Sequence, residues 1–195
     1  IAYHNINADG TSRRGWANWY SASGTLIVEK SIASAEAEAG VAWTRYPSAS
    51  MAANGTTVIA WTDQGLVSPF PNQVRGAIYD SNGNLLKSQF NISGNSDQVN
   101  VYPEVATDPA GAFVVTWTQG FSSSNTDIYG RQFDAAGNPV GAEFVVSASA
   151  NDQGDSDVAL QGSNGVFVVW GDETTPDINA RFYSFPGPGS ISGTV

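Results

Sequence analysis

Acidic side chains are the residues of this 195-residue chain best suited to chemistry, and several of them follow segments rich in Val, Ile, Phe and Trp. Two carboxylates about 5–10 Å apart suffice to hydrolyse a glycosidic bond. The candidates in the longer expected loops are Asp63, Asp127, Asp172, Glu173 and Asp177. No two of these occupy equivalent repeat positions with an evident acid environment. We therefore interpret them as solvated loop residues and expect no catalytic site.

Composition restricts the other kinds of site. His4 is the only histidine and cysteine is absent, which argues against a His-centred triad, a multi-His metal site or a thiolate site. Residues 151–157, NDQGDSD, offer three carboxylates to a hard cation, but they lack the distal Glu of an EF-hand loop. Calcium there stays an open alternative, and no other cofactor is expected.

The charge balance excludes several partners. Eighteen acidic and eight basic residues leave a formal net charge of −10, and Arg13-Arg14 is the only basic pair. Binding to nucleic acid or to anionic lipid needs a basic surface, so neither is expected. No apolar run approaches the ~20 residues of a membrane helix. The 41% hydrophobic content is enough for a packed core.

Two local features bear on processing. The triplets at Asn54 and Asn91 match the glycosylation sequon, although such triplets arise by chance in a chain rich in Asn, Ser and Thr. The chain starts at Ile1 with neither an initiator Met nor a signal peptide, so we interpret it as a mature product or a fragment. Whether either Asn is glycosylated stays open.

One β-rich segment is repeated along the chain with variations in sequence. GTTVIAWTDQ begins at Gly55, GAFVVTWTQG at Gly111 and GVFVVWGDE at Gly165, while the opening IAYHN reads as the end of a further copy. The unit is about 55 residues long, a period typical of propellers and repeat arrays. The copies divide the chain into residues 1–45 (a partial repeat), 46–101, 102–156 and 157–195.

Each unit reads as four strands joined by two tight glycine turns and one longer loop. The sequence therefore predicts an all-β chain of four antiparallel meander repeats, which favours β-propeller blades over a sandwich or a stack of meanders. The first repeat lacks its opening strand, which either an earlier part of the same polypeptide or a neighbouring molecule would supply. Little helix is expected, and the best candidate, residues 33–43, falls where other copies have a loop.

Recurring aromatics predict the core. Residues at one register of a repeat usually pack between sheets, which applies to Trp61, Trp117 and Trp170, to Tyr3 in the first copy, and to Tyr20, Tyr79, Phe133 and Tyr183 before the tight turns. Positive φ is expected in those turns at Gly24, Gly83 and Gly137. The last copy is one residue shorter between Gly165 and Trp170, which predicts a bulge or a reassigned turn.

The segments YPEVATDPAGAFVVTWTQG and DIYGRQFDAAGNPVGAEFVVSASANDQ resemble a repeat of large bacterial secreted and cell-surface proteins, including RTX-type adhesins. The resemblance is strongest over residues 102–153 and weakest over the first 45 residues. It implies an extracellular or cell-surface propeller-like module within a larger polypeptide. It implies no enzymatic activity, because such repeats accompany many different domains.

Three classes of function follow. A lectin-like propeller would expose an aromatic at equivalent loop positions, but only Phe70 and Phe121 lie in comparable loops. A polysaccharide-active enzyme would show one copy with clustered acids, and only the fourth departs mildly. The leading expectation is a non-enzymatic structural or adhesive module, in a larger surface protein or a self-assembling filament or layer. Its expected partners are further copies, other parts of the same protein, or glycans.

Overall fold

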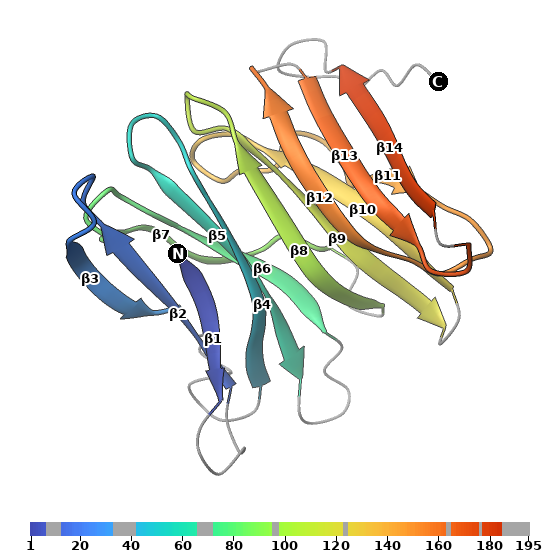
Figure 1. Cartoon of the computed structure of the whole chain (residues 1–195), viewed down its shortest axis with the longest axis horizontal. Helices are drawn as coiled ribbons and strands as arrows, with labels where there is room; N and C mark the ends of the chain where they lie inside the picture. The colour runs from blue at the N-terminus through green and yellow to red at the C-terminus, as the bar shows by residue number, and fades with distance from the viewer. Residues whose placement is uncertain are drawn as a thin grey trace.

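The computed structural model describes residues 1–6, 13–32, 42–65, 72–94, 98–122, 125–162, 165–175 and 177–184. Within these ranges the chain forms fourteen strands and no helix, and the strands make four antiparallel sheets (Figure 1). Strands follow one another in chain order within every sheet. The prediction of an all-β chain of meander repeats is confirmed.

The sheets are named by their order in the chain. The first contains β1 (Ala2–Ile6), β2 (Arg13–Tyr20) and β3 (Leu26–Ser31). The second contains β4 (Ala42–Met51), β5 (Thr57–Gly65), β6 (Gln73–Tyr79) and β7 (Leu85–Asn91). The third contains β8 (Val99–Thr107), β9 (Phe113–Ser122), β10 (Asn125–Phe133) and β11 (Phe144–Ser147). The fourth contains β12 (Gln153–Gln161), β13 (Gly165–Asp172) and β14 (Asp177–Ser184).

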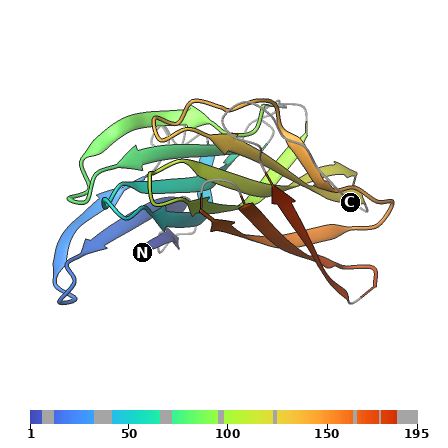
Figure 2. The same cartoon turned by 90° about the horizontal axis from the view of Figure 1, so that it is seen from above.

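Neighbouring sheets pack face to face in the manner of consecutive propeller blades (Figures 1 and 2). The opening strands β4, β8 and β12 lie next to one another, and we call them the inner strands. In the second sheet, the second strand β5 contacts β8, the inner strand of the next sheet. Strand β1 contacts β4 in the same way, so β1 is the second strand of its unit. Among the described residues the first sheet therefore lacks an inner strand, as predicted.

Packing between sheets forms the hydrophobic core. In β5, Val58 and Ala60 pack toward the third sheet, while Ile59 and Trp61 pack toward the first. A strand buried on both faces reads as a continuous apolar run, because successive side chains point to opposite faces. The three recurring indoles are confirmed as core, with exposed fractions of 1%, 0% and 5% for Trp61, Trp117 and Trp170.

Two of the expected core aromatics are exposed. Tyr79, Phe133 and Tyr183 are buried, but Tyr3 is 37% and Tyr20 is 43% exposed. Their neighbours Ala2 and Trp19 face the second sheet, so Tyr3 and Tyr20 point to the opposite side of the first sheet. No other sheet of the described chain packs on that side, which is why the prediction was wrong for this pair.

The turns explain the repeated glycines. Gly24, Gly83 and Gly137 have φ of 81°, 75° and 74°, as predicted. In the fourth sheet the turn is reassigned, also as predicted: Gly162 takes the positive φ (62°) and β13 begins at Gly165. Although the last copy is one residue shorter, Trp170 therefore keeps the position in its sheet that Trp61 and Trp117 have in theirs. Residues 33–41, which hold most of the candidate helix, lie outside the described residues.

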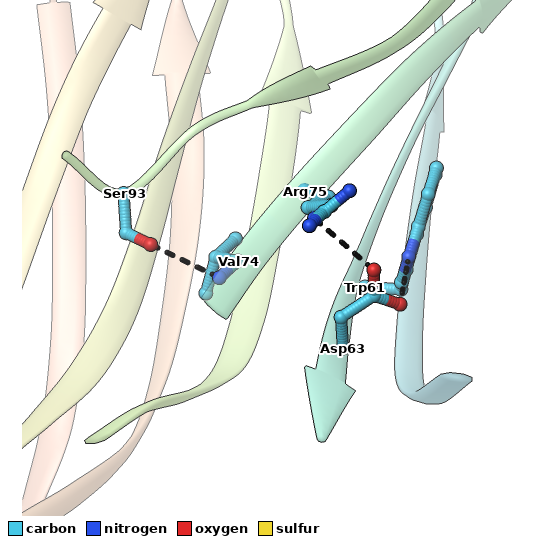
Figure 3. A network of polar contacts seen from close by, with 5 residues as sticks. All are labelled: Trp61, Asp63, Val74, Arg75 and Ser93. Carbon is cyan, nitrogen blue, oxygen red and sulfur yellow. Dashed lines mark hydrogen bonds and ion pairs between the residues drawn. The ribbon is translucent and has the colours of Figure 1, made fainter. Parts of the chain in front are cut away.

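A buried polar network joins the strands of the second sheet (Figure 3). Trp61 Nε1 donates a hydrogen bond to Asp63 Oδ1 at 2.9 Å, and Arg75 Nε lies 3.1 Å from Asp63 Oδ2. Asp63 is only 4% exposed, so its charge depends on this pairing. Asp63 therefore serves the packing of the second sheet. In the same sheet, beyond the end of β7, Ser93 Oγ accepts a hydrogen bond from the Val74 amide at 3.0 Å.

Replacing Trp117 with Ala removes an indole that is fully enclosed between sheets. We expect the free energy of unfolding to fall by about 3–5 kcal/mol, because transfer and cavity terms add. Urea denaturation followed by circular dichroism measures the change. The half-exposed Tyr20 is the matched control, and Tyr20→Ala costing as much as Trp117→Ala would contradict the assigned packing.

Removing one member of the buried ion pair takes a charged partner away from the other. We expect Asp63→Ala to lower the free energy of unfolding by about 3–5 kcal/mol. The double variant Asp63→Ala, Arg75→Met should recover much of that loss, since the buried guanidinium is then removed together with its carboxylate. Denaturation of both single variants and the double variant gives the coupling energy, and strictly additive losses would contradict the pairing.

Candidate active site

Each inner strand carries a bulge at the same place in its repeat. The register shifts fall at Tyr46-Pro47 in β4, Tyr102-Pro103 in β8 and Asp155-Ser156 in β12. The first residue of each bulge has a positive φ, of 50°, 54° and 49° respectively. For non-glycine residues this costs about 1–3 kcal/mol, and such strain gathers at functional sites.

The three bulges border one groove of about 490 Å³. Because the inner strands lie side by side, equivalent positions of three repeats meet there, and no single repeat forms the groove alone. The lining consists of two tyrosines, two prolines, three carboxylates and a serine: Tyr46, Tyr102, Pro47, Pro103, Glu104, Asp155, Asp157 and Ser156.

The two tyrosines form an aromatic wall. The ring centroids of Tyr46 and Tyr102 lie 4.4 Å apart with the planes inclined at 52°. The Arg45 guanidinium lies 4.7 Å from the Tyr46 centroid and also donates a hydrogen bond to Gln64. The hydrogen bond between the two tyrosines, followed by burial, raises the pKa of Tyr102. Such a wall presents an apolar ring face with a polar edge, which suits contact with a sugar ring.

The first paired residue after each bulge differs among the repeats. It is Ser48 in β4, Glu104 in β8 and Asp157 in β12. Ser48 Oγ donates to Glu104 Oε2 at 2.7 Å and accepts the Val105 amide at 3.2 Å. The Ser48 hydroxyl thus links β4 to β8 and supplies a hydrogen-bond donor to the Glu104 carboxyl.

The surroundings of Glu104 raise the pKa of its carboxyl. Burial raises the pKa of this carboxyl, and the negative charge of Asp157 raises it further, while the hydrogen bond from Ser48 lowers it. The net direction is upward, so Glu104 keeps its proton to a higher pH than an ordinary glutamate. A carboxyl with a raised pKa beside a second acidic side chain is an arrangement found in general acid catalysis.

Sequence reasoning missed this site because it searched the longer loops. Glu104 lies instead on an inner strand, and Asp155 and Asp157 belong to the segment that was considered only as a possible calcium site. A signal was present: after the matching Tyr-Pro pairs of the second and third repeats, the next residue changes from Ser48 to Glu104. This difference at one position of a repeated motif places a hydroxyl beside a carboxyl where the two repeats meet.

The loop acids expected from the sequence have separate partners. Asp127 is buried, which raises its pKa, and it accepts the Ser149 amide at 3.2 Å. Asp172 accepts the amides of Thr174 and Thr175, and the Thr175 amide lowers the pKa of its carboxyl most strongly. The other three acids expected in the loops are Asp63 and the exposed Glu173 and Asp177. None of these five loop acids lines the groove.

The calcium alternative is not supported by the arrangement of residues 151–157. Asp155 and Asp157 border the groove, whereas Asp152 accepts a hydrogen bond from Thr126 Oγ1 at 3.5 Å. In the described part of the chain no group of three or more His, Asp or Glu residues is placed to hold a metal ion. The side chains of His4, Phe70 and Phe121 lie outside the described residues, and Asn54 and Asn91 are exposed.

The sequence matches no protein-family model and no curated protein. Solved structures do match its fold. A protein of unknown function from Dyadobacter fermentans aligns with a TM-score of 0.61 and 13% identity over 98% of this chain and 48% of its own. An α-L-arabinofuranosidase from Fusarium graminearum aligns with a TM-score of 0.60 and 12% identity, over 97% of this chain and 60% of its own.

A third similar structure is an α-L-arabinanase from Penicillium chrysogenum in complex with arabinobiose. Its TM-score is 0.57 at 15% identity, over 97% of this chain and 57% of its own. This chain thus spans about half to three fifths of the length of these structures. At such identities the similarity concerns the fold, which is that of propeller-type glycoside hydrolases.

Two sequence-based expectations are corrected by these findings. The suspected relationship to RTX-type adhesin repeats has no support from any family, and the similar structures of named activity are glycoside hydrolases. The expectation of a non-enzymatic structural or adhesive module is wrong for the same reason. The expectation of a non-enzymatic module was based on the lack of an organised pair of acids in the loops. The acids that line the groove lie on the inner strands instead.

The hydrogen bond from Ser48 can be tested directly. We expect Ser48→Ala to raise the pKa of Glu104, because the variant loses a donor that stabilises the carboxylate. Carbon-detected NMR titration of the Glu104 carboxyl measures the shift. Ser48→Thr keeps the hydroxyl and should leave the titration near that of the native chain. A carboxyl that titrates at the same or a lower pH in Ser48→Ala would contradict the assignment.

Proposed function

We propose that this chain is part of a polysaccharide-active enzyme that hydrolyses glycosidic bonds in the groove between the inner strands. One observation carries the proposal: the half-buried Glu104, with its raised pKa, stands beside Asp157 and next to an aromatic wall. The similarity of the fold to arabinan-cleaving hydrolases supports the same class of reaction. Those structures are longer, so the groove here is proposed as a portion of a larger active site.

The proposed reaction uses two carboxylates in different protonation states. Glu104 donates its carboxyl proton to the glycosidic oxygen, so that the bond between this oxygen and the anomeric carbon breaks and the leaving sugar departs as a neutral alcohol. A water molecule attacks the anomeric carbon and gives its proton to Asp157. The proton lost by Glu104 is thereby matched by the one gained at Asp157, and exchange with solvent restores both groups.

The lining favours a neutral glycan. Glu104, Asp155 and Asp157 bring negative charge to the groove, and the whole chain carries a net charge of −10. A uronic acid or a sulfated sugar would meet repulsion there, whereas the ring face of a neutral sugar can pack on Tyr46 and Tyr102. Neutral pentose polymers such as arabinan are therefore the first substrates to test.

A polysaccharide substrate also favours an extracellular location for the protein, because such polymers are met outside the cell. The described residues include no helix long and apolar enough to cross a membrane. Partners other than glycans are not needed for the proposed reaction.

The test is release of reducing ends from a panel of neutral and acidic polysaccharides. We expect the native chain to act on a neutral polymer and Glu104→Gln to lose about 10²–10⁴-fold in rate, the usual contribution of a general acid. The rate of the native chain should fall as pH rises through the raised pKa of Glu104, because the donor then loses its proton. Asp177→Asn, which changes an exposed carboxylate outside the groove, should keep the native rate.

The outcomes separate the alternatives. Sugar binding without hydrolysis, lost on changing Tyr102 to Ala, would replace hydrolysis by lectin-like binding in the same groove. Hydrolysis that survives in Glu104→Gln would contradict the assigned proton donor. If a correctly folded chain neither binds nor hydrolyses any polysaccharide of the panel, the proposal as a whole is contradicted.

A further inference from the structure

The first residue of the inner-strand bulge changes its chemistry in the fourth sheet. It is Tyr46 in β4 and Tyr102 in β8, but Asp155 in β12. All three have a positive φ, a conformation that aspartate adopts more often than tyrosine. The exchange of a phenol ring for a carboxylate ends the aromatic wall at the fourth sheet. One edge of the groove is therefore acidic at the level of the two rings.

The carboxylate of Asp155 is open to a ligand. Its side chain is exposed and borders the groove, and no residue of the described chain donates a hydrogen bond to this carboxylate. The other two groove acids have such donors. Glu104 accepts from Ser48 Oγ at 2.7 Å, and Asp157 accepts from the Val158 amide at 2.8 Å. Because both oxygens of a carboxylate are acceptors, Asp155 can take two donors from a molecule bound in the groove.

Electrostatic interactions place Asp155 beside the aromatic wall. The hydrogen bond with Tyr46 raises the pKa of Tyr102 most, burial raises it further, and the negative charge of Asp155 adds to the increase. Burial likewise raises the pKa of Glu104 most, but the charge that adds to it there is that of Asp157. Asp155 therefore stands next to the Tyr102 ring, while Asp157 stands next to the proposed proton donor.

A neutral sugar ring has the shape and the donors that this edge needs. When one face of the ring packs on Tyr102, the hydroxyl groups project from the rim of the ring. Neighbouring hydroxyls at that rim can donate to the two oxygens of Asp155. A site built to bind a hydroxyl rejects an analogue that lacks it far more strongly than apolar contact alone can do. The rings thus supply contact area, and the carboxylate discriminates among sugars.

We propose that Asp155 is a specificity-determining residue of the groove, and that its carboxylate accepts hydrogen bonds from two neighbouring hydroxyls of the neutral sugar ring packed on Tyr102. This inference rests on the proposed function, because it takes the same groove as the glycan site. Asp155 takes no part in proton transfer. Its loss therefore weakens the binding of the sugar, while Glu104 and Asp157 keep their places.

Binding of neutral disaccharides tests the inference, with arabinobiose, xylobiose and cellobiose as probes. NMR titration in a Glu104→Gln background measures each dissociation constant without turnover. We expect Asp155→Asn to raise the dissociation constant of the tightest probe about 10–100-fold, because a hydrogen bond to a charged acceptor is lost. Asparagine has the size of aspartate and tolerates the positive φ, so the bulge is retained. The matched control Asp177→Asn, at an exposed position outside the groove, should leave the constant unchanged.

Singly deoxygenated analogues of the tightest probe separate direct contact from a structural effect. Two analogues that lack neighbouring hydroxyls should bind about 10-fold more weakly than the probe when Asp155 is present. In Asp155→Asn the same two analogues should bind about as tightly as the probe. If the removal of every hydroxyl weakens binding equally in both chains, Asp155 does not contact the sugar and the inference is overturned.

The placement of the carboxylate is tested without any ligand. Asp155→Asn should lower the pKa of Tyr102, because a neighbouring negative charge is removed, whereas Asp177→Asn should not. NMR titration of the Tyr102 phenol measures the change, and an unchanged pKa in Asp155→Asn would contradict the placement.

The failure of this inference is distinguishable from the failure of the proposed function. Hydrolysis that needs Glu104, together with sugar binding that is unaffected in Asp155→Asn, would overturn the role of Asp155 and leave the proposed reaction in place. Sugar binding that depends on Asp155 in a chain without hydrolytic activity would support the inference and contradict the reaction. Failure of all three disaccharides to bind would overturn the inference.

Discussion

Face-to-face packing of consecutive sheets is the interaction on which the rest of this structure depends. A four-stranded meander has two faces, and the central strands β5 and β9 are apolar on both, so a single sheet cannot shield itself from water. Trp61, Trp117 and Trp170 occupy one register of successive sheets because each fills the gap to the sheet before it. Asp63 and Arg75 both belong to the second sheet, and the packing of the neighbouring sheets shields their ion pair from water.

The same packing creates the groove. Once the sheets are stacked, the inner strands are held side by side, and their bulges can remain in a strained conformation at Tyr46, Tyr102 and Asp155. Contacts then form between repeats that are distant in the chain, such as the hydrogen bond from Ser48 to Glu104 across 56 residues. The chemistry of the groove is therefore a property of neighbouring repeats together. Burial at this junction, rather than any local motif, is the largest cause of the raised pKa of Glu104.

The mistaken functional interpretation has a related cause. The resemblance to surface-protein repeats rested on whole strand and turn segments, most of whose residues a four-stranded repeat of this kind needs to fold. Such residues report architecture and leave the activity undetermined. The acids to which we assign the proposed activity lie one position beyond a bulge: Glu104 was part of the segment that carried the resemblance, and Asp157 was considered only as a possible calcium ligand. Loops were searched because functional residues often lie there, and this groove is built from strand edges instead.

The sequence by itself determined the elements: the apolar β-rich runs, the positive-φ glycines and the recurring tryptophans are local patterns whose physical meaning does not depend on distant residues. The meander order was predictable for that reason, as was a bulge or a reassigned turn before β13. Only the tertiary structure decided which faces are covered, and hence that Tyr3 and Tyr20 are exposed while Trp61 is enclosed. It also decided that Ser48, Glu104 and Asp157 meet, because the side-by-side placement of the inner strands follows from sheet packing and not from any spacing along the chain.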